Sequence, residues 1–110
     1  MEVERLFTLL HKMGGVKIGS NAMIAAQCYI IDTDHGIKAG KLMRQQENTV
    51  SPIVIGDDVW VAAGAKILKG SVLGDGCIIG AQAVVKGQIP SNAIAAGVPA
   101  KIMKYRSNNE

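Results

Sequence analysis

The sequence predicts an all-β fold, a parallel β-helix built from six-residue repeats, and three observations support this prediction. Aliphatic residues recur every six positions, at Ile18, Ile24, Ile30, Ile55, Val61, Ile67, Leu73, Ile79 and Val85. The residue two places before each of these sites is mostly small. The chain has 13 glycines but only 4% aromatic residues, which suits a narrow core. An ordinary antiparallel sheet with accidental spacing does not account for so regular a pattern.

A period of six matches neither a plain strand nor an α-helix, so each repeat must hold a short strand and a corner. One large and one small side chain per repeat point inward and fill a thin prism. Glycine, asparagine or aspartate near each corner permits the sharp turn, and Asn21, Asp57, Gly64 and Gly76 suit that position. Three repeats then close one triangular coil, and coils stack about 4.8 Å apart through backbone hydrogen bonds.

The repeat pattern is interrupted once, between Ile30 and Ile55. These residues are 25 positions apart, one more than a multiple of six. The segment 36–52 is polar and aperiodic, and we interpret it as a loop extruded from one corner of the coil. Long loops in compact domains are usually functional. Its polar side chains either contact an acceptor molecule or are simply solvated: Lys38, Lys41, Arg44, Gln45 and Gln46.

The 110 residues are expected to form one domain. Residues 1–14 would form a helical cap, with Leu6, Leu10 and Met13 on one face, and the β-helix would occupy 15–90. Pro90 and Pro99 are expected to end the repeats. Residues 91–110 would form a turn and a tail, and the tail would be a second, weaker helical cap, because a solenoid must cover its open ends.

Charge and composition limit the function classes. The net charge is +3 with dispersed basic residues, whereas nucleic-acid-binding surfaces cluster them, so we expect no nucleic-acid partner. There is no apolar run of membrane-spanning length and no signal-peptide pattern near Glu2 and Glu4, which predicts a cytoplasmic protein without a membrane span. Cys28 and Cys77 are weak evidence for a disulfide in a reducing compartment.

Four blocks together carry a resemblance to a known family. They are IDTDHGI at 31–37, PIVIGDDVWVAAGAKILKG at 52–70, VLGDGCIIGAQAVV at 72–85 and IPSNAIAAGVPAKI at 89–102. In this order and spacing, over residues 15–106, the sequence resembles the hexapeptide-repeat acyltransferases. The similarity is greatest to maltose and galactoside acetyltransferases and to surface-polysaccharide O-acetyltransferases.

The resemblance implies a left-handed β-helix and a homotrimer. It also implies an acetyltransferase that takes its acetyl group from acetyl-CoA, bound in a groove between neighbouring subunits. The acceptor would be a hydroxyl or amine of a small molecule, a sugar or nucleotide sugar. No metal is implied.

His35 is the first candidate for catalysis. An imidazole can accept a proton from an acceptor hydroxyl or amine near neutral pH, and in the family the matching histidine is the general base. The alternative is a solvated histidine at the start of a loop. Asp32 and Asp34 flank His35, so either carboxylate could orient the ring. Asp34 occupies a position that usually points inward, so a structural role at the exit of the loop fits it as well as a catalytic one does.

The remaining candidates come mainly from the resemblance. It implies that Ala63 provides a backbone N–H for the oxyanion and that Ala81 provides a second backbone contact to CoA. Trp60 precedes an inward site and should point outward, toward the groove or a subunit contact. For the CoA phosphates the family commonly has Thr-Lys before Ile-Pro, but here the lysine comes one place early. The cationic candidates are Lys86, Lys101 and Arg106, which could equally be surface charges.

Two other functions compete with acetyl transfer. The first is a non-catalytic scaffold trimer, which is compatible with the short N-terminus and the altered Lys86-Gly87 block. The second is a zinc enzyme of the carbonic anhydrase kind, but that site needs three histidines. Here only His35 is well placed, and His11 has no motif around it.

Overall fold

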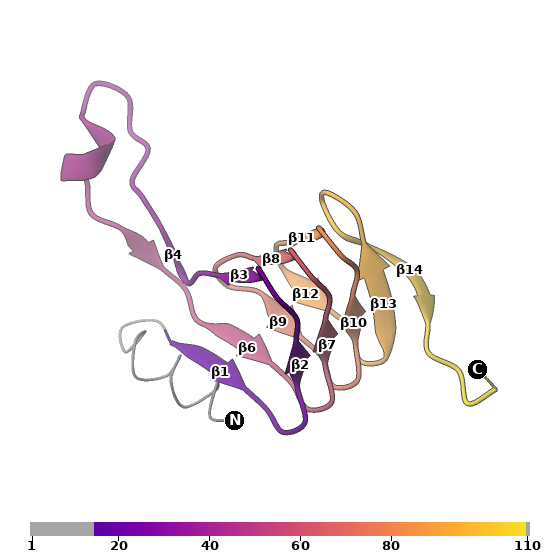
Figure 1. Cartoon of the computed structure of the whole chain (residues 1–110). Helices are drawn as coiled ribbons and strands as arrows, with labels where there is room; N and C mark the ends of the chain where they lie inside the picture. Colours follow the sequence, from indigo (N-terminus) through magenta and orange to yellow (C-terminus); the bar gives the residue numbers. More distant parts are fainter. Residues whose placement is uncertain (1–14, 110) are drawn as a thin grey trace.

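A computed structural model describes residues 15–109, which form a triangular coil of short strands (Figure 1). The first sheet contains β1 (Val16–Ile18), β6 (Ile53–Ile55), β9 (Val72–Leu73) and β12 (Gln88–Ile89). The second contains β2 (Met23–Ile24), β7 (Trp60–Val61), β10 (Ile78–Ile79) and β13 (Ala93–Ala96). The third contains β3 (Tyr29–Ile30), β8 (Lys66–Ile67) and β11 (Val84–Val85). Pairing within these three sets is parallel, so the predicted parallel β-helix is confirmed.

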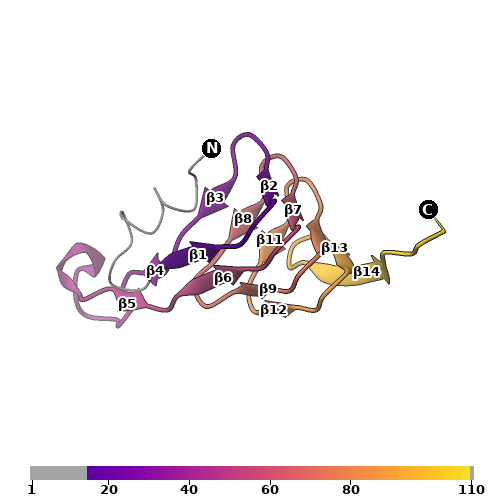
Figure 2. The same ribbon diagram turned by 90° about the horizontal axis from the view of Figure 1, so that it is seen from below.

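The backbone register shows how the coils stack. Asp57 and Asp75 occupy the same corner of successive coils and are 18 residues apart, so one coil is three six-residue repeats. Ser20 and Asp57 share that corner but are 37 residues apart, because an excursion of the chain lies between them. In the view from below, strands of successive coils lie side by side (Figure 2).

The core consists of the large inward residues at the six-residue spacing. From Ile55 to Val85 each of them is 0–1% exposed, and burial of one such side chain contributes about 1.5–3 kcal/mol. The small residues two places earlier are buried as well, among them Val59, Ala65, Cys77 and Ala83. In the first coil Ile24 is only partly buried. The alternating large and small residues therefore fill the prism as predicted.

The corners between the first and second sheets are bonded from coil to coil. The backbone N–H of Ser20 donates to the carboxylate of Asp57, and the N–H of Asp57 donates to that of Asp75, at 2.8 and 2.7 Å. The next corner residues, Asp58 and Gly76, have φ of 55° and 75°. At Gly76 a Cβ atom would also meet the side-chain oxygen of Asn92 in the coil above, so glycine is favoured at that corner.

The interruption after Ile30 is an excursion of the chain out of the coil, as predicted (Figure 1). Its base is a two-stranded antiparallel ribbon of β4 (Thr33–Asp34) and β5 (Thr49–Val50), and its outer part holds a 3₁₀ turn, η1 (Met43–Gln45). The excursion thus begins at residue 33, three residues before the predicted loop. It leaves the edge of the prism between the third and first sheets.

Two predictions at the C-terminal end were wrong. Pro90 does not end the repeats, because β12 and β13 add strands to the first and second sheets on either side of it. The six-residue spacing missed this coil because Ile89 follows Val85 by only four residues, through a shortened corner at Gly87 with φ of 111°. The cap at this end is not helical either, since β14 (Lys101–Tyr105) pairs antiparallel with β13. The predicted N-terminal helical cap lies outside the described residues.

Candidate functional site

His35 directly follows β4, at the base of the excursion. Its side chain is exposed, and no described residue hydrogen-bonds to its ring. It lines a cleft of about 900 Å³ formed by the two limbs of the excursion, together with Lys69 from the second coil. Both ring nitrogens are therefore available to a ligand in the cleft, as a general base requires.

The two aspartates beside His35 have different surroundings. Asp34 lies in the exposed ribbon, where its carboxylate is 3.8 Å from the ammonium of Lys69 and its side chain is 56% exposed. The expectation that Asp34 points inward was wrong, because the chain has already left the coil at this residue. Asp34 lines the cleft beside His35.

Asp32 is the buried member of the pair, at 2% exposure. Its carboxylate accepts the backbone N–H of Gly15 at 2.9 Å, and its backbone carbonyl accepts the N–H of Ser51 at 3.0 Å. Asp32 does not line the cleft that holds His35. It ties the start of the first coil to the point where the excursion leaves and returns, which fixes the base of the loop.

The side chain of Trp60 points outward from β7, as predicted, and is 45% exposed. It belongs to an outward apolar column on the second sheet, formed by Met23, Trp60, Ile78 and Ile94 in register on four successive strands. The sequence analysis did not identify these four residues as one column. The signal was present, because the residue directly before each inward site points outward and is apolar in these four strands. A half-exposed apolar ladder of this kind is typical of a surface that another molecule covers.

Ala63 and Ala81 lie on the edge between the second and third sheets, one coil apart. Both are exposed, and the carbonyl of Ala63 accepts the N–H of Gln82 at 3.0 Å. Among the described residues, nothing accepts a hydrogen bond from the N–H of Ala63 or Ala81. These two N–H groups are therefore available as donors to a bound ligand.

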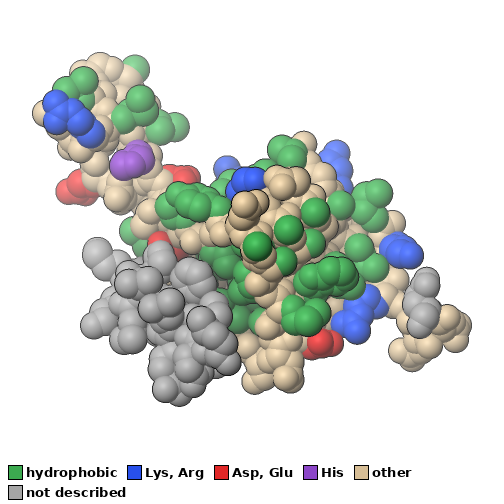
Figure 3. Space-filling view, in the orientation of Figure 1, with side chains coloured by type: hydrophobic (Ala, Val, Ile, Leu, Met, Phe, Trp, Pro, Cys, Tyr) green, Lys and Arg blue, Asp and Glu red, His purple; other side chains and the backbone are tan. Residues whose placement is uncertain are grey.

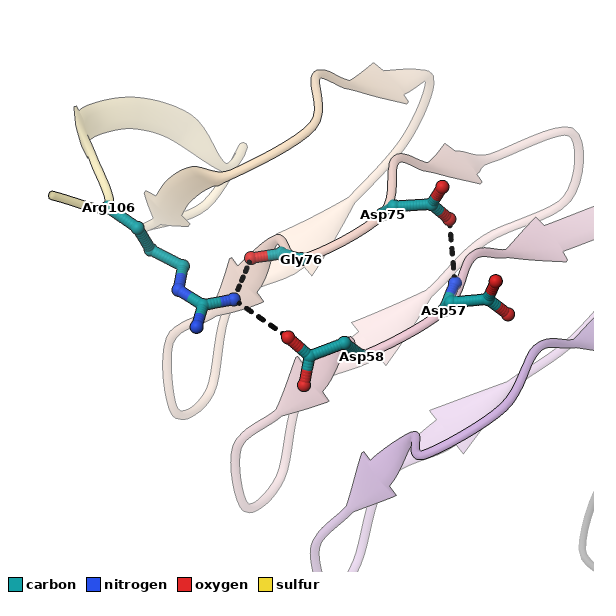
Figure 4. Close-up of polar contacts among 5 residues, drawn as sticks. All are labelled: Asp57, Asp58, Asp75, Gly76 and Arg106. Atoms are coloured by element: carbon teal, nitrogen blue, oxygen red, sulfur yellow. Dashed lines mark hydrogen bonds and ion pairs between the residues drawn. The ribbon is translucent and has the colours of Figure 1, made fainter. Parts of the chain in front are cut away.

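The three cationic candidates do not converge. Lys86 is exposed beside the shortened corner, and Lys101 is exposed in β14. The guanidinium of Arg106 donates to the carboxylate of Asp58 at 3.1 Å and to the carbonyl of Gly76 at 3.0 Å (Figure 4). In this position Arg106 ties the C-terminal tail to two coils, at the edge between the first and second sheets.

One chain therefore does not bring the candidate residues together. The cleft of His35 lies on the edge between the third and first sheets, and none of the six predicted oxyanion or cofactor contacts lines it. Ala63 and Ala81 lie on a second edge and Arg106 on the third. Lys86 shares the edge of His35 but lies two coils further along, between β11 and β12. This geometry defines a solenoid whose candidate base and candidate oxyanion donor lie on separate edges.

Burial changes the acidity of one group in the core. Desolvation raises the pKa of the Cys77 thiol from 9.0 to about 11, helped by the Asp75 carboxylate and partly offset by a backbone hydrogen bond. Cys28 and Cys77 are both free thiols. Within residues 15–109, no three metal-ligating side chains gather into a metal site, and no helix is long and apolar enough to cross a membrane.

Comparison with known proteins identifies the class of solenoid. The family described as bacterial transferase hexapeptide (six repeats) matches residues 52–87. Residues 52–87 carry the hexapeptide repeats of that family, and the coil is a left-handed parallel β-helix like those of the hexapeptide-repeat acetyltransferases.

Three similar proteins illustrate this likeness. A Mycobacterium tuberculosis protein named "probable acetyltransferase" is 39% identical over 83% of this chain and 31% of its own length. Galactoside O-acetyltransferase of Escherichia coli is 36% identical over 81% of this chain and 43% of its own. A structure of galactoside acetyltransferase in complex with coenzyme A superimposes with a TM-score of 0.80 and 34% identity, over 86% of this chain and 46% of the other. The chain spans less than half the length of each of these proteins.

Proposed function

We propose that the protein is an acetyl-CoA-dependent acetyltransferase acting on a hydroxyl or amine of a sugar or nucleotide sugar, with His35 as general base at a subunit interface. The observation that carries the proposal is the exposed, unpaired ring of His35 in the cleft of the excursion. Its support from relatives is the galactoside acetyltransferase that was solved with coenzyme A.

The chemistry follows from the groups available. His35 takes the proton from the acceptor hydroxyl or amine, whose oxygen or nitrogen then attacks the carbonyl carbon of the thioester. The negative charge that develops on the carbonyl oxygen is stabilised by the free N–H of Ala63. Collapse of the intermediate expels the CoA thiolate, which takes the proton back from the imidazolium. Asp34 lies beside the base, and Asp32 positions it by fixing the base of the loop.

The remaining candidates would bind the cofactor. Ala81 would supply its unpaired N–H to the CoA arm, and Trp60 would contact the groove from the outer face of the second sheet. Lys86 and Lys101 would interact with the phosphates. Arg106 would join them only by releasing Asp58 or by using its other guanidinium nitrogens.

The separation of the candidates over three edges supports a homotrimer with shared sites. His35 on one subunit can meet Ala63 only if a neighbour presents its edge between the second and third sheets to the excursion. Two apolar surfaces support such an assembly. One is the outward column that contains Trp60, and the other is on the excursion, where Ile37, Leu42 and Met43 are 84%, 55% and 63% exposed.

The first test is calorimetric titration of acetyl-CoA into protein whose oligomeric state is known from sedimentation. Saturable binding near one site per chain supports the transferase. A trimer that binds neither acetyl-CoA nor CoA would instead be a scaffold, the competing function.

The second test is His35→Ala, which should retain CoA binding but lower turnover by a factor on the order of 10² or more. Asn48→Ala, an exposed change in the excursion outside the cleft lining, is the matched control and should have wild-type turnover. Full turnover in His35→Ala would remove this residue from the mechanism.

Mixed trimers test the shared site directly. Ala81→Trp would block the cofactor edge, so it should be inactive alone, as should His35→Ala. If base and cofactor edge come from different subunits, an equal, randomly mixed assembly regains about one quarter of the wild-type activity. If each chain carries a complete site, the mixture stays inactive.

A further inference from the structure

The cleft of the excursion carries more positive than negative charge. Three lysines line it, Lys38, Lys41 and Lys69, against the carboxylates of Asp34 and Glu47. Lys69 and Asp34 form a pair at 3.8 Å. Neither Lys38 nor Lys41 has an ion-pair partner among the described residues. The ammonium groups of Lys38 and Lys41 therefore share the cleft with one carboxylate that Lys69 does not engage, that of Glu47. Figure 3 shows basic side-chain atoms on the projecting loop.

The backbone that carries these two lysines is held by Gln46. The side-chain oxygen of Gln46 accepts the N–H of Lys38 at 2.9 Å. Its side-chain nitrogen donates to the carbonyls of Lys38 and Lys41 at 3.0 and 3.2 Å. Gly36 leaves room for this clamp, because a Cβ atom there would lie 2.8 Å from the Gln46 side chain. Gln46, considered above as an acceptor contact, thus uses its amide inside the loop and fixes the spacing of the lysine positions.

Resting on the proposed function, we infer that the acceptor is an anionic sugar, with a carboxylate or phosphate bound by Lys38 and Lys41 while its hydroxyl or amine meets His35. Ammonium groups on flexible stems bind such anions as point charges. The geometry assigns the anion to the acceptor because both lysines line the cleft of the general base. Gln46 is a positioning residue that holds the backbone of the two lysines at a fixed spacing beside that cleft.

The test measures the binding of three probes to the assembled 110-residue chain: glucuronate, glucose 1-phosphate and uncharged glucose. Binding is measured by saturation-transfer NMR or calorimetry in the presence of CoA, so the outcome does not depend on catalysis. We expect one anionic probe to bind about three- to thirtyfold more tightly than glucose, the range expected from two partly solvated charge contacts. Preference for glucuronate identifies a carboxylate acceptor and preference for glucose 1-phosphate a phosphorylated one. Equal binding of all three probes, or no binding, overturns the inference.

The double substitution Lys38→Gln and Lys41→Gln should abolish the preference for the anion. Lys17→Gln, which changes an exposed lysine of β1 outside the cleft lining, is the control and should keep it. A preference that survives the double substitution overturns the inference. So does a double variant that loses CoA affinity instead, because the lysines would then serve the cofactor.

Two adjacent glutamines test the clamp. Gln46→Ala should speed hydrogen exchange at the Lys38 amide and reduce the anion preference, whereas Gln45→Ala, which removes an exposed side chain, should not change exchange there. Lys38 exchange unaffected by Gln46→Ala would remove the positioning role. If acetyl transfer is absent but the anion preference is present, the proposed function fails and the binding inference stands. If neutral sugars are acetylated as well as anionic ones, the proposed function stands and the inference of an anionic acceptor fails.

Discussion

The two aspartates next to the candidate base, two residues apart, give a sharp test of structural against catalytic roles. We predict that Asp32→Ala destabilises the fold, whereas Asp34→Ala leaves stability nearly unchanged. Asp32 is 2% exposed and accepts the N–H of Gly15 at 2.9 Å, while the Asp34 side chain is 56% exposed with only a 3.8 Å ion pair. The difference lies in burial and geometry, because both residues are carboxylates at the base of the same loop.

The magnitudes follow from those contacts. Removing the Asp32 carboxylate eliminates a charge-assisted hydrogen bond and leaves the part-buried N–H of Gly15 without that acceptor, which costs about 2–3 kcal/mol. Asp32→Asn keeps an oxygen acceptor and should cost about 1 kcal/mol. For Asp34→Ala, loss of a surface ion pair costs about 0–1 kcal/mol.

Guanidinium unfolding at constant protein concentration measures these differences, because the midpoint of an oligomer depends on concentration. Turnover is measured on the same samples at a temperature where each variant is folded. Wild-type stability in Asp32→Ala with a large loss of turnover would contradict the structural role. A loss of 2 kcal/mol or more in Asp34→Ala would contradict the account of its exposed position.

Two further predictions concern the core and the C-terminal tail. Because burial raises the pKa of Cys77 from 9.0 to about 11, its contribution to stability is complete below pH 9 and is lost as the pH rises from 9 to 11, by up to about 2–3 kcal/mol. Cys77→Ala should lack this loss. The prediction is refuted if the difference in unfolding free energy between the wild type and Cys77→Ala is the same at pH 8 and at pH 11. Arg106→Ala should cost about 1 kcal/mol and speed hydrogen exchange in β14, because Arg106 ties the tail to Asp58 and Gly76. Exchange unchanged from the wild type would mean that β14 is held by its pairing with β13 alone.

The coil was predictable because inward residues recur with one fixed period. The large residues at the six-residue sites from Ile55 to Val85 are buried, and the smaller residues two places before most of them are buried as well. The prediction failed where the period itself changed. At Gly87 a corner is two residues shorter, so Ile89 and Ala93 fell outside the pattern although both are buried.

The site was predictable only in part. His35 could be placed at the start of a loop, but the burial of Asp32 and the exposure of Asp34 could not be assigned. The alternation of inward and outward side chains no longer follows the six-residue repeat once the chain leaves the coil. The Gln46 clamp was invisible for a related reason. It joins residues five and eight positions apart through a loop closure that no periodicity encodes.

The architecture itself explains why the candidate chemistry is concentrated in the excursion. Most inward positions are filled by aliphatic residues, and the corner backbone bonds to the next coil, so a polar change without a hydrogen-bond partner at either place disrupts the stack. Outward strand positions tolerate substitution, but the pairing of strands between coils fixes the spacing of their side chains. Within residues 15–109, the segment between β4 and β5 leaves the ladder while remaining anchored at its base, by Asp32 on one limb and by the β4–β5 pairing between the two limbs. Under the proposed function, acceptor specificity would therefore change in this segment at little cost to the coil, and the lysines and Gln46 lie in that segment.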